Sequence, residues 1–268
     1  MDNEKLKTWL VVGASSGFGH EICRQLLAKN KNVIAVARRV PDFTDNRALC
    51  LSVDATQPQT IRAAIKTAID KFGHIDALVN CCGLGQWQTF ESTTDDEFRK
   101  LMDVSFWGYV NTIREVLPLF RVQGHGLIVN ISSQSGMCPR IYGTAYCSAK
   151  YAIEGLTGAL WCETQKFCKV IAVEFGVFPT GMASKDMMRE NTFPEYENLP
   201  PIPYKIKRHY KNDIALAVSY LINVAQQQNP PRRIILGRDA YDRIKQEARA
   251  TLAVLKKSKP FFNVSKKS

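Results

Sequence analysis

Three residues in the middle of the chain have the types and spacing needed for proton transfer. Tyr146 and Lys150 are four residues apart, so on a helix they share one face. A nearby ammonium favours the phenolate and lowers the pKa of a tyrosine from about 10 toward the range of a general acid. Ser133 follows an apolar run, where its hydroxyl could hydrogen-bond a substrate carbonyl. Because a Tyr–Lys pair of this spacing is also common on exposed helices, the catalytic interpretation needs further support.

A glycine-rich run near the beginning of the chain could bind a phosphate. It reads Gly13-Ala-Ser15-Ser16-Gly17-Phe18-Gly19, after an apolar segment and at the beginning of a helical pattern. Glycine permits a sharp turn and a close approach to a ligand, and a helix N-terminus offers free N–H groups. A tight strand–helix turn without a ligand is the alternative. The position in the first βα unit favours a dinucleotide site, although the spacing is GxxxGxG rather than GxGxxG.

The second apolar run ends in two arginines, which bears on the type of dinucleotide. An NAD site usually presents a carboxylate near the end of this strand, to bind the ribose 2′-hydroxyl. Arg38 and Arg39 stand there instead, and guanidinium groups suit the 2′-phosphate of NADP. We therefore expect NADP(H), with NAD(H) as the alternative if both arginines simply face solvent.

The elements that must position these residues alternate between two patterns. Predicted strands cover residues 10–12, 32–37, 49–53, 76–80, 127–132, 170–175 and 233–236. Predicted helices cover residues 17–29, 57–72, 95–120, 146–167, 213–226 and 239–255, and Pro118 should interrupt the third. This order predicts an α/β fold, a doubly wound parallel sheet of about seven strands that is Rossmann-like and forms a single domain over residues 1–255. Residues 182–210 lack a period and are expected to form a substrate lid.

Composition and charge limit the remaining possibilities. The chain has 268 residues, 45% of them hydrophobic, which excludes wholesale disorder. Its net charge is +11, and residues 232–268 carry eleven Lys/Arg against three Asp/Glu. We expect a solvated helix followed by a basic tail over 256–268. A nucleic-acid site is the weaker alternative, because no aromatic platform accompanies the charge.

Cysteine and histidine usage argues against metal sites and disulfides. None of the eight cysteines forms a CxxC pair, and the four histidines are scattered, so no metal is expected. No apolar run approaches about 18 residues and the first residues lack the pattern of a signal peptide. These features predict a soluble, cytoplasmic protein with no membrane partner.

Five motifs in the right order make the sequence resemble the short-chain dehydrogenase/reductase family. The TGxxxGxG turn matches at residues 12–19, with Val12 where Thr is usual, and the NNAG motif matches as Asn80-Cys81-Cys82-Gly83. The catalytic Ser and YxxxK motifs match at Ser133, Tyr146 and Lys150. The PGxxxT segment matches as residues 175–180, and the adenine-binding Asp matches Asp54.

The resemblance implies a mechanism and a set of contacts. Hydride would pass between NADP(H) and a carbonyl or secondary alcohol, with Tyr146 as general acid/base, Ser133 orienting the oxygen and Lys150 lowering the tyrosine pKa. The cofactor-binding residues it implies are Gly13, Ser15, Ser16, Gly17, Phe18, Gly19, Arg38, Arg39, Asp54, Ala55, Asn80, Cys81, Cys82, Gly83, Tyr146, Lys150, Gly176, Val177 and Thr180.

Two motifs depart from the family pattern. Cys81 and Cys82 replace Asn and Ala but are small enough to pack against the adenosine. Ser105 stands where the family often has a catalytic Asn whose backbone carbonyl holds a water of the proton relay. Ser105 keeps a backbone carbonyl, so activity is expected. A non-catalytic NADP(H)-binding sensor or scaffold is the alternative.

The substrate is expected to be a small apolar carbonyl or alcohol. Ser133, Tyr146, Gln86 and Trp87 should contact it, together with residues 137–142 and Phe178. Phe193, Tyr196 and Tyr204 would make the pocket aromatic unless they are packing residues. The resemblance also implies a homodimer or homotetramer through helices with apolar faces at 98–117 and 151–161, unless the C-terminal helix of the same chain covers those faces.

Overall fold

A parallel sheet forms the centre of the molecule. The structure is a computed structural model that describes residues 6–180, 182, 193–200 and 211–259. In this part of the chain the strands are β1 (Thr8–Val12), β2 (Asn32–Ala37), β3 (Ala48–Ser52), β4 (Ala77–Asn80), β5 (Leu127–Ile131), β6 (Lys169–Phe175) and β7 (Arg233–Leu236). Their order in space is β3-β2-β1-β4-β5-β6-β7, and every pairing is parallel. The predicted seven-stranded α/β fold is therefore confirmed.

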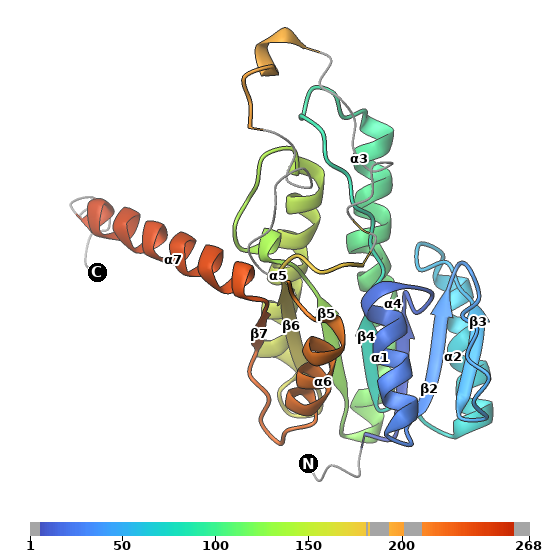
Figure 1. The fold of residues 1–268 in the computed structure, drawn as a ribbon. Coiled ribbons are helices and arrows are strands. Elements are labelled where there is room, and N and C mark those ends of the chain that lie inside the picture. Colours follow the sequence, from blue (N-terminus) through green and yellow to red (C-terminus); the bar gives the residue numbers. More distant parts are fainter. Residues whose placement is uncertain (1–5, 181, 183–192, 201–210, 260–268) are drawn as a thin grey trace, which may run out of the picture.

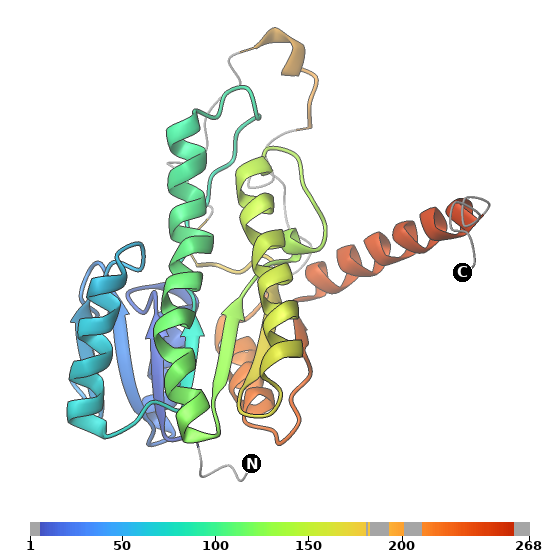
Figure 2. The ribbon, with the colours of Figure 1, turned by 180° about the vertical axis from the view of Figure 1, so that it is seen from behind.

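Helices cover both faces of this sheet (Figures 1 and 2). On one face lie α1 (Gly17–Ala28) and α6 (Ile214–Ala225), which pack against each other. On the other lie α2 (Pro58–Phe72), α3 (Asp95–Met102) with α4 (Gly108–Gln123), and α5 (Thr144–Thr164). A last helix, α7 (Arg238–Ser258), leaves the body beyond β7 and projects from it.

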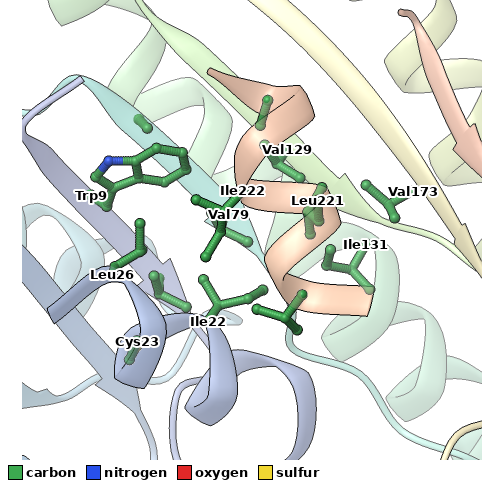
Figure 3. Packing of buried hydrophobic residues seen from close by; sticks show 14 of the residues in the cluster. Trp9, Ile22, Cys23, Leu26, Val79, Val129, Ile131, Val173, Leu221 and Ile222 are labelled. Carbon is green, nitrogen blue, oxygen red and sulfur yellow. The ribbon is translucent and has the colours of Figure 1, made fainter. Parts of the chain in front are cut away.

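Two apolar cores, one on each face, hold these layers together. Figure 3 shows the first, in which Trp9 of β1, Ile22 and Leu26 of α1, and Leu221 and Ile222 of α6 meet over the sheet. Such strands are apolar almost throughout because both of their faces are covered. Each large apolar side chain that folding buries completely contributes about 1.5–3 kcal/mol.

The long helical region differs from its predicted form. Thr94 and Glu97 make a capping box that begins α3. The helix then widens into a π-helical turn, Asp103–Trp107, and continues as α4 through Pro118 to Gln123. The predicted interruption at Pro118 was wrong, because buried Val116 and Phe120 hold this part of the helix against the sheet. The irregularity lies around Ser105 instead.

The C-terminal part corrects two further expectations. Helix α7 continues to Ser258, three residues into the predicted tail, while residues 260–268 lie outside the described residues. Only its beginning is anchored, through buried Ala240 and Ile244, and its main contacts are with β7 and the 3-10 turn Gln134–Gly136. The alternative in which this helix covers the long helices is therefore wrong.

The predicted lid is only partly described. Met182 and residues 193–200, with the short turn Pro194–Tyr196, are seen, and the rest of 182–210 lies outside the described residues. Among the helices described, none combines the length and the apolar character that crossing a bilayer requires.

Candidate active site

A cavity of about 990 Å³ lies along the carboxyl ends of the central strands. Its wall includes the last residues of β1, β2, β5 and β6, and the residues just after β4. Ligands of doubly wound sheets bind at this edge, next to the point where the strand order reverses. Here the reversal lies between β1 and β4, beside the glycine-rich turn.

Close backbone packing explains the glycines of this turn. Gly13 has φ +93°, and a Cβ there would lie 2.7 Å from the Cys82 backbone nitrogen. A Cβ on Gly19 would lie 2.3 Å from the Gly13 carbonyl oxygen, so α1 can begin this close to β1 only without a side chain. Gly17 has φ +55° and lies against Thr180. The turn thus places the N-terminus of α1 at the cavity, and the N–H groups of a helix N-terminus suit a phosphate group.

The end of β2 carries the two predicted arginines. Arg38 and Arg39 are exposed and both line the cavity. Arg39 donates a hydrogen bond to the Ser15 carbonyl at 3.0 Å, which ties it to the glycine-rich turn. Asp54 follows β3, and its carboxylate accepts hydrogen bonds from the Thr56 N–H and hydroxyl. No carboxylate occupies the end of β2 itself.

Most of the other predicted cofactor contacts also lie on the cavity wall. They are Gly13, Ser15, Ser16, Gly17, Phe18, Asp54, Ala55, Cys81, Cys82, Gly83, Gly176, Val177 and Thr180. Burial raises the pKa of both cysteine thiols to about 12, so they are neutral, small groups on this wall. The Val177 N–H, however, donates to Asp239 at 2.8 Å rather than facing the cavity without a partner.

The predicted catalytic residues meet on the opposite part of the wall. Tyr146 and Lys150 lie one turn apart at the beginning of α5, and Ser133 lies two residues beyond the end of β5. All three line the cavity, with exposed fractions of 8% or less. The Lys150 ammonium donates to the Ile131 carbonyl at 2.8 Å and lies 5.8 Å from the centre of the Tyr146 ring. The Tyr146 hydroxyl contacts the Met182 sulfur at 3.9 Å.

Burial has the largest effect on the pKa values of Tyr146 and Lys150. It raises the pKa of Tyr146, although the neighbouring Ser133 hydroxyl and the Arg140 charge act in the opposite direction. Burial also lowers the pKa of Lys150, to about 8. The expected lowering of the tyrosine pKa by Lys150 is therefore not seen here, because removal of the phenol from water dominates and the opposing effects come from Ser133 and Arg140.

Ser105 is a structural neighbour of the cavity rather than part of its wall. It is fully buried in the π-helical turn, and its hydroxyl accepts a hydrogen bond from the Leu84 N–H at 3.0 Å. The preceding residue, Val104, does line the cavity. Such π-helical turns occur frequently at functional sites.

Three other predicted residues also lie away from the wall. Asn80 is buried beneath it, where its amide donates to Asn130 and accepts from Thr112. Gly19 lies behind the glycine-rich turn, and Gln86 is half-buried in the loop after β4. The structure does not bring these side chains to the cavity.

The substrate end of the cavity contains residues that the motifs did not indicate. Trp87 and Phe178 line it as expected, and Arg140 belongs to the predicted stretch 137–142. Asp239 and Arg243 from the beginning of α7 were missed. Nothing in the sequence around them signals a site, since they reach the cavity only because α7 begins beside the loop after β6 and the 3-10 turn. Phe193 and Tyr196 pack on each other away from this wall, and Tyr204 lies outside the described residues.

No group of three or more His, Cys, Asp or Glu side chains has an arrangement suited to a metal ion within the described ranges. The site instead combines a glycine-rich turn at the beginning of α1, a cavity of about 990 Å³ and a buried Tyr–Lys–Ser group, an arrangement typical of nucleotide-dependent oxidoreductases.

Comparison with known proteins identifies the family. The sequence profile of the short chain dehydrogenase family matches residues 7–191. An uncharacterized oxidoreductase of Schizosaccharomyces pombe is 31% identical over 90% of this chain and 85% of its own length. A 3-ketodihydrosphingosine reductase of Bacteroides thetaiotaomicron is 35% identical over 68% of each chain. The chain belongs to the short-chain dehydrogenase/reductase family.

Solved structures agree with this assignment. A short-chain dehydrogenase from Streptomyces avermitilis superposes with a TM-score of 0.87 at 31% identity and covers 97% of this chain and 98% of its own. A 3-ketoacyl-(acyl-carrier-protein) reductase of Brucella melitensis, complexed with NADH, superposes with a TM-score of 0.62 at 27% identity over 66% of this chain and 77% of its own. The chain is thus an oxidoreductase of a family that uses nicotinamide cofactors.

Proposed function

We propose that this protein transfers hydride between NADP(H) and a small carbonyl or secondary alcohol substrate, with Tyr146 as the general acid/base. The observation that carries the proposal is the position of Ser133, Tyr146 and Lys150 on one wall of a cavity whose other end is the glycine-rich turn. A nicotinamide cofactor held by that turn would supply the hydride. The protein supplies position, charge and the proton.

Each of the three side chains has a separate task in this scheme. The raised pKa keeps the Tyr146 hydroxyl protonated at neutral pH, so it can donate a proton to the oxygen of the reduced carbonyl. The Ser133 hydroxyl orients that oxygen through a hydrogen bond. The charged Lys150 ammonium, held by the Ile131 carbonyl, stabilises the phenolate left after proton transfer.

The proposal of NADP over NAD rests on the end of β2. Two guanidinium groups line the cavity there, and the Asp54 carboxylate, which also lines it, is already bonded to Thr56. Arginine binds a ribose 2′-phosphate through paired hydrogen bonds. Since a reductase similar to this chain was solved with NADH, cofactor choice has to be measured for this protein.

We also propose that the protein is cytoplasmic and forms a homodimer or homotetramer. Helices α4 and α5 lie side by side on one face of the sheet (Figure 2), and Trp107 next to α4 and Tyr151 of α5 have exposed fractions of 46% and 43%. Covering such side chains is a common source of subunit association.

The test is to follow oxidation of NADPH, and separately NADH, in the presence of a panel of aldehydes and ketones. We expect NADPH to be used faster, and Tyr146→Phe to lower kcat by about 100-fold or more, because the proton donor is removed. Removing both arginines, as Arg38→Ala with Arg39→Ala, should reduce the preference for NADPH by about tenfold or more. The exposed Arg249→Ala serves as the control for loss of positive charge. Full turnover by Tyr146→Phe would refute the proposed role of the phenol.

A non-catalytic NADP(H) sensor is the second candidate, and the observation behind it is Ser105 in place of the usual Asn. It predicts tight cofactor binding without turnover of any panel member. If the missing Asn is what prevents catalysis, restoring the amide by Ser105→Asn should produce measurable activity.

A further inference from the structure

We propose that the substrate of this oxidoreductase carries an anionic group, a carboxylate or a phosphate, that Arg140 and Arg243 bind at the end of the cavity beyond Tyr146. This inference rests on the proposed function, since it names the class of substrate for the same site. It replaces the expectation of a purely apolar pocket with one that is apolar along its wall and cationic at its end.

The two arginines come from distant parts of the chain but line the same cavity. Arg140 lies in the loop between β5 and α5, and Arg243 lies in the second turn of α7. The guanidinium carbon of Arg140 lies 5.5 Å from the centre of the Trp87 ring, which lies 5.1 Å from the centre of the Tyr146 ring. The Trp87 ring thus contacts both the cationic group and the phenol that donates the proton.

Neither arginine has an acidic partner among the described residues. Arg243 donates to the neutral Pro139 carbonyl at 3.2 Å, and Asp239 and Glu247 lie one turn before and after it on α7. The Arg140 Nε atom is buried without a hydrogen-bond partner. Burial and the nearby charge of Arg243 lower the pKa of Arg140, and the opposing effects of Tyr146, Cys147 and Asp239 do not cancel them, so a bound anion would offset the repulsion between the two guanidinium groups.

The acidic side chain at this end of the cavity is already committed. Asp239 accepts hydrogen bonds from the Gln134 amide and the Val177 N–H on one oxygen, and from the Asn212 amide on the other. It holds α7 to the loop after β6 rather than pairing with Arg140 or Arg243.

The cofactor does not account for these two charges. The features suited to its phosphate groups are the glycine-rich turn after β1 and the arginines after β2. Strands β1 and β4 lie between β2 and β5 in the sheet, so Arg140 lies at the opposite end of the cavity from Arg38. The alternative is a purely structural role, in which Arg140 stacks on Trp87 and Arg243 only holds the loop. The experiment must distinguish this role from anion binding.

Matched pairs of compounds provide the test. Each pair consists of a keto acid and its methyl ester, with about two to six methylene groups between the ketone and the carboxyl group. The enzyme is assayed with NADPH as wild type, Arg140→Gln, Arg140→Lys and Arg243→Gln. Arg249→Gln, an exposed arginine of the same helix that does not line the cavity, is the control.

We expect wild type to favour the acid over the ester by about 10-fold or more in kcat/KM at the best chain length. Arg140→Gln and Arg243→Gln should lose this preference through a higher KM for the acid, so that the acid-to-ester ratio of kcat/KM, measured within each variant, falls by about 10-fold or more. Arg140→Lys should restore part of the preference, which a merely structural role would not produce. An unchanged preference in both Gln variants, or an ester that is used as well as its acid by wild type, overturns the proposal.

These outcomes remain distinct from failure of the proposed function. Equal turnover of esters and acids supports the reductase activity and refutes only the proposal that the substrate is anionic. If no compound is turned over, titration calorimetry with the same acids and esters in the presence of NADP tests the anion site directly. Acid binding that the Arg140 and Arg243 variants abolish supports the anion site, and equal binding by all variants refutes it.

Discussion

The two halves of the sheet, on either side of the boundary between β1 and β4, differ in the kinds of groups that they bury. The first half, β1 to β3 with α1 and the glycine-rich turn, consists of apolar strands and backbone in close contact. The second half, β4 to β7 with α5, places charged and polar side chains in the interior. Lys150, Glu154 and Glu174 are all at least 94% buried there.

The difference shows what binding and chemistry each require. A dinucleotide can be bound largely by shape, because bare glycine backbone approaches its phosphates and helix N–H groups face them. Proton transfer needs ionisable side chains with shifted pKa values, and those shifts come from burial. In the second half, burial shifts the pKa values of Lys150 and Glu174 away from their charged forms, so these groups destabilise the fold when they are charged.

The largest effect should come from changing the shape of the first half. Gly19→Ala would place a Cβ 2.3 Å from the Gly13 carbonyl oxygen, so the turn must shift. We expect cofactor affinity to fall by about 100-fold, measured by titration with NADPH, together with a loss of about 1–3 kcal/mol in the free energy of unfolding.

Gly155→Ala, at an exposed position of α5, is the matched control, because a Cβ at this glycine would have nothing within 4 Å of it. It should leave affinity unchanged and raise stability by about 0.5–1 kcal/mol. If both substitutions behave alike, close backbone approach does not explain the glycines of the turn.

A second prediction concerns the charge of Lys150. Burial lowers its pKa to about 8, so above that pH the ammonium loses its proton and no longer stabilises the Tyr146 phenolate. We expect kcat/KM for carbonyl reduction to be flat at lower pH and to fall about tenfold per unit above pH ~8. Lys150→Arg remains charged, so its falling limb should move to higher pH. Coincident profiles would show that another group titrates.

The smallest effect should be a gain in stability in the second half. Burial and the neighbouring Glu154 raise the pKa of Glu174 to about 8, and these effects outweigh its ion pair with Arg233 at 3.3 Å. Because the folded-state pKa is raised, the fold is favoured while Glu174 is protonated, and stability is lost as pH rises from about 4.5 to 8.

Glu174→Gln removes this loss, so we expect it to be more stable than wild type by about 1–3 kcal/mol at pH 8 and nearly equal to it near pH 4.5. Thermal unfolding across this range is the measurement, with exposed Glu163→Gln of α5 as the control. Parallel curves for wild type and Glu174→Gln would mean that the carboxyl is not protonated in the folded state.

Regular patterns in the sequence predicted most of the fold. β2 and β7 begin and end where their apolar runs do, and the other strands differ by one or two residues at an end. The exceptions are Pro118, which the packing of α4 tolerates, and the π-helical turn at Ser105, which no periodicity signals. The end of α7 was also missed, because a basic, exposed helix and a frayed tail have the same composition.

The sequence by itself determined the alternation of strands and helices, the glycine-rich turn, the arginines after β2 and the Tyr146–Lys150 pair. All of these depend on residues close together along the chain, where spacing sets geometry directly. Tertiary structure alone decided that burial raises the pKa of Tyr146, that Ser105 and Asn80 lie off the cavity wall, and that Arg140 and Arg243 share its far end. The physical reason is that burial and charge proximity depend on which distant segments meet, and the local pattern of a chain does not contain that information.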